Sequence, residues 1–113
     1  MQQIRFSQLS KPRQLLVRTC QRVNHGAILN TAVTNGEIDL DNPPDVVFDF
    51  HLANDVVARA ELDLTDFILP AETCRLLAQI DSLQEGLLEK ITVFDGIPRR
   101  VIVRRSLPSE AIP

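Results

Sequence analysis

The sequence predicts an α+β fold in which two amphipathic helices pack on one face of an antiparallel sheet of about four to six strands. Residues 26–36 read GAILNTAVTNG and residues 86–96 read GLLEKITVFDG, so a glycine, a stretch of β-forming residues and a turn dipeptide recur 60 positions apart. Each stretch follows a segment with the apolar spacing of an amphipathic helix. We therefore expect an internal repeat of a helix-then-β-hairpin unit.

The first helix is expected over residues 11–25. Its apolar residues fall on one stripe of a helix; they are Leu15, Leu16, Cys20 and Val23. Ser10 is suited to the N-cap, and Pro12 lies in the first turn, where a missing N–H breaks no helical hydrogen bond. Gly26 is expected to adopt the left-handed conformation that ends many helices.

The second helix is expected over residues 70–85 and repeats the pattern of the first. Its apolar stripe consists of Leu76, Leu77, Ile80 and Leu83. Gly86 takes the place of Gly26 and is expected to end this helix in the same way.

A β-hairpin is expected after each helix. In the first, a two-residue turn at Asn35-Gly36 places Val33 opposite Ile38, so that apolar residues share a face. In the second, the same register sets Val93 against Pro98, so we predict a three-residue loop over 94–96 that pairs Val93 with Ile97. This register also places Ile91, Val101 and Val103 on one face.

The middle of the chain is the part without a counterpart in the repeat. A break at 41–44, which contains two prolines, is followed by alternating apolar residues over 46–52, which predict a half-buried strand with Phe48 and Phe50 inward. A weaker strand is expected over 60–64.

These elements predict one α+β domain over residues 1–105. The repeat units cover about 10–40 and 70–105, residues 45–64 form an insertion, and 106–113 are expected to be a flexible tail. The apolar runs are shorter than the ~20 residues that span a bilayer. We therefore expect a cytoplasmic protein with no membrane partner.

Motifs that carry catalytic chemistry are absent from the sequence. It has no GxSxG, Walker-type phosphate loop, GxGxxG, HExxH or EF-hand spacing. Cys20 and Cys74 lie in helical stripes and are read as structural, and His25 and His51 have no ligand spacing to either cysteine. No catalytic residue, metal site or cofactor is predicted.

Acidic and basic residues are separated along the chain. Residues 1–35 hold five Lys or Arg and no acid, whereas residues 37–72 hold ten acids and one base. The candidate nucleic-acid contacts are Lys11, Arg18, Arg22, Arg99, Arg100, Arg104 and Arg105. Two observations oppose this use: the net charge is -3, and with no Trp or Tyr and only Phe94 expected to be exposed there is no base-stacking platform.

The leading hypothesis is a small non-enzymatic intracellular binding or regulatory module that acts through protein–protein contacts, including homodimer formation. One alternative is a nucleic-acid-binding protein that uses the basic helix stripe and the C-terminal arginines. A second is a small enzyme or metal-dependent protein that uses the acidic middle segment.

Overall fold

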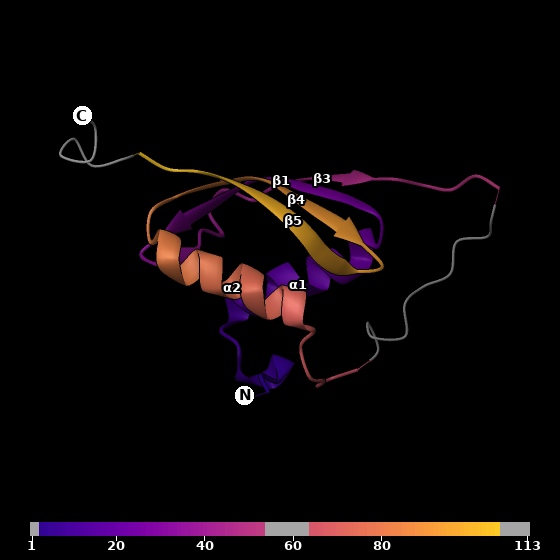
Figure 1. The fold of residues 1–113 in the computed structure, drawn as a ribbon, viewed down its shortest axis with the longest axis horizontal. Coiled ribbons are helices and arrows are strands. Elements are labelled where there is room, and N and C mark those ends of the chain that lie inside the picture. The colour runs from indigo at the N-terminus through magenta and orange to yellow at the C-terminus, as the bar shows by residue number, and fades with distance from the viewer. Residues whose placement is uncertain (1–2, 54–63, 107–113) are drawn as a thin grey trace.

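A computed structural model of the chain describes residues 3–53 and 64–106, and its fold is α+β, as predicted (Figure 1). The elements in chain order are η1 (Phe6–Gln8), α1 (Lys11–Val23), β1 (Gly26–Thr34), β2 (Glu37–Ile38), β3 (Asp45–Phe48), α2 (Ala71–Leu83), β4 (Gly86–Phe94) and β5 (Ile97–Arg104). None of the helices in these ranges is long and apolar enough to cross a membrane.

The five strands form one antiparallel sheet with the order β2-β1-β4-β5. The two longest strands, β1 and β4, lie at its centre, with Ile28 opposite Ile91 and Thr31 opposite Leu88. Both β2 and β3 pair with the other side of β1, at its two ends, so β3 and β5 lie at opposite edges of the sheet.

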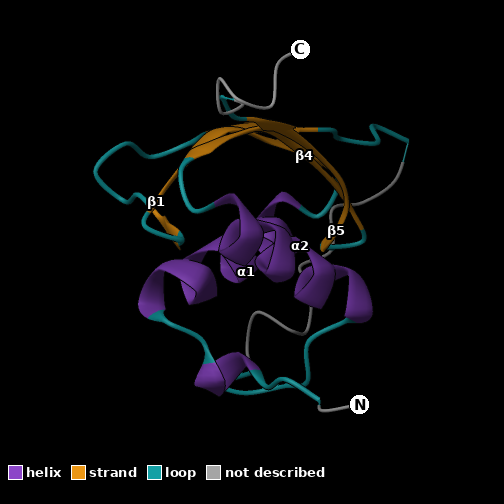
Figure 2. Cartoon of the chain, turned by 60° about the vertical axis from the view of Figure 1, so that its left-hand side comes forward, coloured by secondary structure: helices purple, strands orange, loops and turns teal. Residues whose placement is uncertain are grey.

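The sheet is arched, and Figure 2 shows α1 and α2 beneath the arch. The space between them is filled by buried apolar side chains. The hydrophobic core consists of Phe6, Leu16, Val17, Cys20, Val23, Ile28, Val33, Ile38, Leu69, Leu76, Leu77, Ile80, Leu83, Leu88, Ile91 and Val93. Most of the residues in the predicted helix stripes are therefore core residues, although Leu15 is exposed.

The helices begin as predicted but end earlier. The Ser10 side chain accepts a hydrogen bond from the Arg13 N–H at 3.4 Å, which confirms the N-cap. The prediction that Gly26 and Gly86 end the helices is wrong. The residues that directly follow α1 and α2 are Asn24 and Gln84, and these have positive φ (62° and 60°) with negative ψ.

Gly26 and Gly86 instead allow an edge strand to approach closely. A Cβ atom on Gly26 would lie 1.9 Å from the carbonyl oxygen of Val47 in β3. A Cβ atom on Gly86 would lie 2.7 Å from the carbonyl oxygen of Arg104 in β5. Both glycines are therefore needed where a neighbouring backbone passes, not where a helix stops.

The first hairpin has the predicted register, since Val33 lies opposite Ile38. The prediction for the second hairpin is wrong in its loop length. Phe94 pairs with Ile97 and Val93 with Pro98 around a two-residue turn, and both turns have positive φ at both central residues, as a type I′ turn requires. A register shift between Thr92 and Val93, where Arg99 is left unpaired, then sets Ile91 opposite Val101.

The prediction that Phe48 and Phe50 point inward is also wrong. β3 covers only Asp45–Phe48, all four of its residues are exposed, and Phe48 and Phe50 keep 46% and 59% of their surface exposed. The alternation predicts the strand correctly, but β3 is an edge strand whose side chains stay exposed on both faces. The strand predicted over 60–64 and the predicted tail lie largely outside the described residues.

Candidate interaction site at the sheet edges

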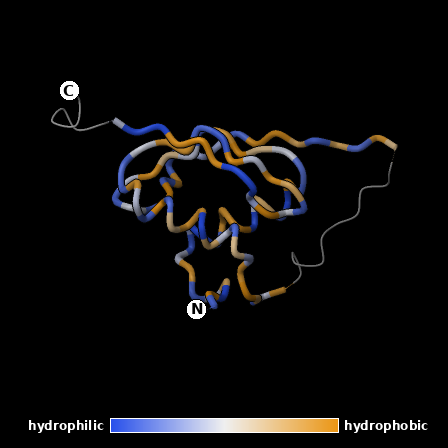
Figure 3. Tube along the Cα trace, in the orientation of Figure 1, coloured by the Kyte–Doolittle hydropathy of each residue, from blue (hydrophilic) through white to orange (hydrophobic). Residues whose placement is uncertain are grey.

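The described residues expose apolar side chains along β3 and the chain that follows it. Val46, Val47 and Phe48 are each 40–47% exposed, and Leu52 is 96% exposed. Figure 1 shows β3 and the segment after it extending away from the helices, and Figure 3 shows that hydrophobic residues recur along it. This edge strand thus offers both backbone groups and apolar side chains to solvent.

The two aromatic rings of this segment pack against each other. The rings of Phe48 and Phe50 are stacked, with centroids 5.6 Å apart and planes 7° apart. Because the pair is exposed, it forms a small apolar platform beside the open edge. This site was not among the residues predicted from the sequence, although the segment DVVFDF at 45–50, in which acids border exposed apolar residues, marks it.

The opposite edge of the sheet, β5, is basic on its outer face. Arg100 and Arg104 are exposed there on either side of Ile102, which is 45% exposed. Arg104 forms an ion pair with Glu89 of β4, whereas Arg100 has no ion-pair partner within residues 3–53 and 64–106.

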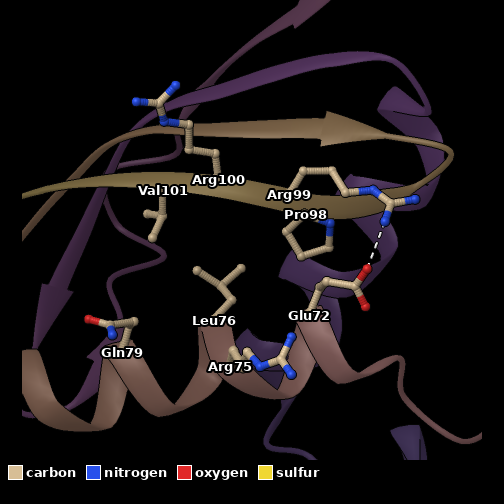
Figure 4. Close-up of a pocket in the computed structure, with 8 residues that line it drawn as sticks. All are labelled: Glu72, Arg75, Leu76, Gln79, Pro98, Arg99, Arg100 and Val101. Atoms are coloured by element: carbon tan, nitrogen blue, oxygen red, sulfur yellow. Dashed lines mark hydrogen bonds and ion pairs between the residues drawn. The ribbon is translucent and has the colours of Figure 1, made fainter.

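A groove runs between β5 and α2. One pocket in it is lined by residues of both elements: Glu72, Arg75, Leu76, Gln79, Pro98, Arg99, Arg100 and Val101. In Figure 4, Val101 and Leu76 point toward each other, while Arg100 points away from the helix. A second pocket farther along is lined by Gln79, Ser82, Leu83, Val103 and Arg105. The groove therefore has an apolar floor, with Glu72 and Arg75 of α2 on one side and Arg99 of β5 on the other.

Three of the seven basic residues singled out from the sequence are engaged in contacts within the protein. The guanidinium of Arg18 lies over the rings of Phe6 and Phe67, 4.4 and 5.4 Å from their centroids, and donates to the carbonyl of Leu64. Arg99 donates to the Glu72 carboxylate at 2.6 Å, and Arg104 pairs with Glu89.

The remaining four basic residues are exposed in different places. Lys11 lies at the start of α1 and Arg22 in its last turn. Arg100 lies on the outer face of β5, and Arg105 faces the end of α2 across the second pocket. Only Arg100 and Arg104 share one strand face, since Arg99 pairs with Glu72 of α2 and Arg105 follows the end of β5.

The cysteines and acids show no catalytic or metal-binding grouping in the part of the chain that the structure describes. Burial raises the pKa of the Cys20 thiol to about 12, which disfavours the thiolate that nucleophilic chemistry needs. Nowhere in residues 3–53 and 64–106 are three His, Cys, Asp or Glu side chains placed together so that they could hold a metal ion.

Comparisons with known proteins give no match to any family model, curated protein or solved structure.

Proposed function

We propose that the chain is a small non-enzymatic binding module that acts through protein–protein contacts, including contacts with itself. The observation that supports this most directly is the edge strand β3, all of whose residues are exposed and whose apolar residues continue into Phe50 and Leu52. An exposed edge strand with apolar side chains is a template for pairing with another chain.

We further infer that the two helix-hairpin units are copies of one unit and that both helices cover one face of the sheet. α1 and α2 are each 13 residues long and begin 60 positions apart, at Lys11 and Ala71. The ladder between β1 and β4 has the same symmetry, since Gly26 lies opposite Val93 while Val33 lies opposite Gly86. These relations are those of a pseudo-twofold axis that passes between β1 and β4.

The two edges of the sheet differ where the units differ. In the second unit β5 runs along most of β4, whereas in the first the equivalent path is divided into β2 and β3 by the loop over 39–44. A duplicated core with unlike edges gives the module two surfaces of different chemistry. We assign binding to these edges because the rest of the described sheet is paired.

The test is the dependence of molecular mass on protein concentration, measured by sedimentation velocity. The chain is expected to self-associate, and the double variant Phe48→Ser/Phe50→Ser is expected to shift it toward the monomer. Phe94→Ser is a matched control, because Phe94 is 56% exposed but lies at the turn between β4 and β5. A chain that is monomeric at all concentrations and turns over a small substrate would overturn the proposal.

The two alternatives have less support. Arg18, Arg99 and Arg104 already contact aromatic rings or carboxylates, so fewer of the candidate residues are available for phosphates. The described acids of the middle segment do not gather into a metal site.

A further inference from the structure

The two edges of the sheet carry opposite charges. On β3 and just after it, Asp45 and Asp49 are exposed, and on β5 Arg100 and Arg104 are exposed. In both cases the two charges are separated by four positions, with an exposed apolar residue halfway between them, Val47 or Ile102. The edges therefore present the same pattern with inverted sign.

The same alternation places the apolar residues of both edges on corresponding faces. Val46 lies opposite Ile28, which is fully buried, so Val46 and Phe48 belong to the helix-covered face of the sheet, and Asp45 and Val47 to the outer face. On β5, Val101 and Val103 are half-buried against the core, while Arg100, Ile102 and Arg104 lie outside. The two patterns can thus be joined without turning either strand over.

We propose, as an extension of the proposed self-binding function, that β3 of one copy pairs antiparallel with β5 of a second copy. The register sets Val47 opposite Ile102. Asp45 then faces Arg104 and Asp49 faces Arg100 on the outer side of the joined sheet. On the helix side, Val46 meets Val103 and Phe48 meets Val101.

The backbone of β3 is prepared for such pairing. The N–H of Asp49 donates to the carbonyl of His25 at 2.7 Å, so the backbone N–H of Asp49 points toward the residue that precedes β1. The backbone N–H and C=O groups of successive residues in an antiparallel strand point alternately to its two neighbours. Those of Val46 and Phe48 therefore point toward the edge of β3 that has no partner strand among the described residues. Backbone hydrogen bonds across the interface would then come from the same residues whose side chains enter the groove.

The groove between β5 and α2 can accommodate the side chains that this register places beside it. Val101 and Leu76 form its apolar floor at one end, where Figure 4 shows them pointing toward each other. Phe48 of the second copy would lie against Val101, and its stacking on Phe50 extends the apolar contact toward the start of β5.

Charge disfavours the symmetric pairings that are centred on the same two apolar residues, Val47 and Ile102. If two β3 strands pair about a twofold axis at Val47, Asp45 of each lies opposite Asp49 of the other. If two β5 strands pair at Ile102, Arg100 lies opposite Arg104. Like charges directly opposite are destabilising in a sheet, whereas the β3-to-β5 contact pairs opposite charges twice. This contact is heterologous, so it builds a ring or an open chain of copies and not an isolated dimer.

The test is a charge exchange. The β3 variant Asp45→Arg/Asp49→Arg and the β5 variant Arg100→Asp/Arg104→Asp are each expected to weaken self-association at least ~100-fold, because each places like charges across the contact. Mixing the two variants is expected to restore association, and so is combining all four substitutions in one chain. The variant Lys11→Asp/Arg22→Asp is the control, since it makes on α1 the same change of charge as the β5 variant and is expected to have no effect.

A second pair of variants separates a heterologous contact from a symmetric one. Val47→Lys leaves β5 intact and Ile102→Lys leaves β3 intact, so each alone is expected to be monomeric and their mixture to give a complex of two chains. Circular dichroism and thermal unfolding verify that each variant folds.

The outcomes distinguish this inference from the function on which it rests. Self-association that survives the charge reversals, or that is not restored by the exchange, overturns the β3-to-β5 contact and leaves the binding function standing. A native chain that binds only a different protein has the same consequence. A native chain with no protein partner at all, including itself, overturns both.

Discussion

Gly36 donates its backbone N–H to the carbonyl oxygen of Gln84 at 2.8 Å, and Gly96 donates to the carbonyl oxygen of Asn24 at 2.9 Å. Each hairpin turn is therefore held by the residue that ends the helix of the other unit. The neighbouring N–H groups follow the same rule, since Asn35 donates to the Glu85 side chain and Asp95 to Nδ1 of His25. These reciprocal contacts join the two units at both ends of the sheet.

The contacts also account for the backbone conformations of Asn24 and Gln84. Both have positive φ with negative ψ, and in both the next residue donates its N–H back to the last residue of the helix, at 2.6 Å. Such tight three-residue turns are strained. They aim the carbonyl of Asn24 or Gln84 at the turn glycine, so the strain is compensated by a hydrogen bond between the units.

Gly36→Ala is expected to lower the free energy of unfolding by ~1–2 kcal/mol, because φ at Gly36 is +72° and an L-residue is disfavoured there. Its Cβ atom would also lie 2.8 Å from Nε2 of Gln84, which must move. Urea denaturation measures the change. Gly96→Ala is the matched variant, with φ +71°, and a loss of similar size is expected; unchanged stability in both would contradict the role given to the turns.

Gly26→Ala is expected to detach β3 while the rest of the fold persists, since the new Cβ atom would overlap the carbonyl oxygen of Val47. The measurement is amide hydrogen exchange. The Asp49 N–H, which donates to His25, is expected to exchange at least ~10-fold faster, equivalent to ~1.4 kcal/mol. The Gly96 N–H serves as the internal control and should keep its protection. Loss of protection at both sites would mean that Gly26 supports the whole sheet and not β3 alone.

Thr31→Val is expected to stabilise the protein by ~1 kcal/mol. Thr31 is 1% exposed, lies opposite Leu88 at the centre of the sheet, and its hydroxyl has no hydrogen-bond partner within the described residues. Valine keeps the shape and removes the unsatisfied group. Ile91 lies 60 positions later and is also fully buried, and Ile91→Thr is expected to cost ~1–3 kcal/mol. Thermal unfolding compares both variants with the native chain, and destabilisation by Thr31→Val would contradict this account.

The sequence predicted the elements whose signals are local. The apolar stripes that contain Leu16 and Ile80 located both helices, and Asn35-Gly36 located the first turn and its register. The errors arose where the local structure depends on a segment that is distant in the sequence. Whether Gly26 ends a helix or lies under β3 depends on where β3 passes. The register of the second hairpin depends on how β5 pairs with β4, where Thr92 lies opposite Arg100 and Arg99 is left unpaired.

Part of the candidate site could also be read from the sequence. The sequence singles out the basic residues Arg99, Arg100, Arg104 and Arg105 as a candidate interaction site, but the alternation around Phe48 and Phe50 predicts that these two rings are buried. Alternation distinguishes the two faces of a strand, and it does not say whether a helix lies over one of them. The exposed β3 edge therefore became visible only when the positions of α1 and α2 were known.

Arg18 and Arg22 are expected to behave differently although both were candidate nucleic-acid contacts. Arg18→Ala removes a cation held over Phe6 and Phe67 and is expected to cost ~1–2 kcal/mol of stability. Arg22→Ala, at an exposed position in the last turn of α1, is expected to change stability by less than ~0.5 kcal/mol. Urea denaturation of the two variants decides the point; equal effects would show that the contact of Arg18 with the rings contributes nothing.

Asp66 is expected to make the attachment of the N-terminal segment dependent on pH. Its carboxylate accepts hydrogen bonds from Nε of Arg5 and from the backbone N–H of Ser7, and these lower the pKa of Asp66 to about 2. Because this pKa is lower in the folded than in the unfolded chain, where it is about 3.9, the stabilisation is complete above that value. It is lost as the pH falls toward 2. An NMR titration should therefore show the Ser7 amide shifting in a transition centred near pH 2. In Asp66→Asn the shift should be absent, and a transition of the native chain centred near pH 4 would contradict the assigned contact.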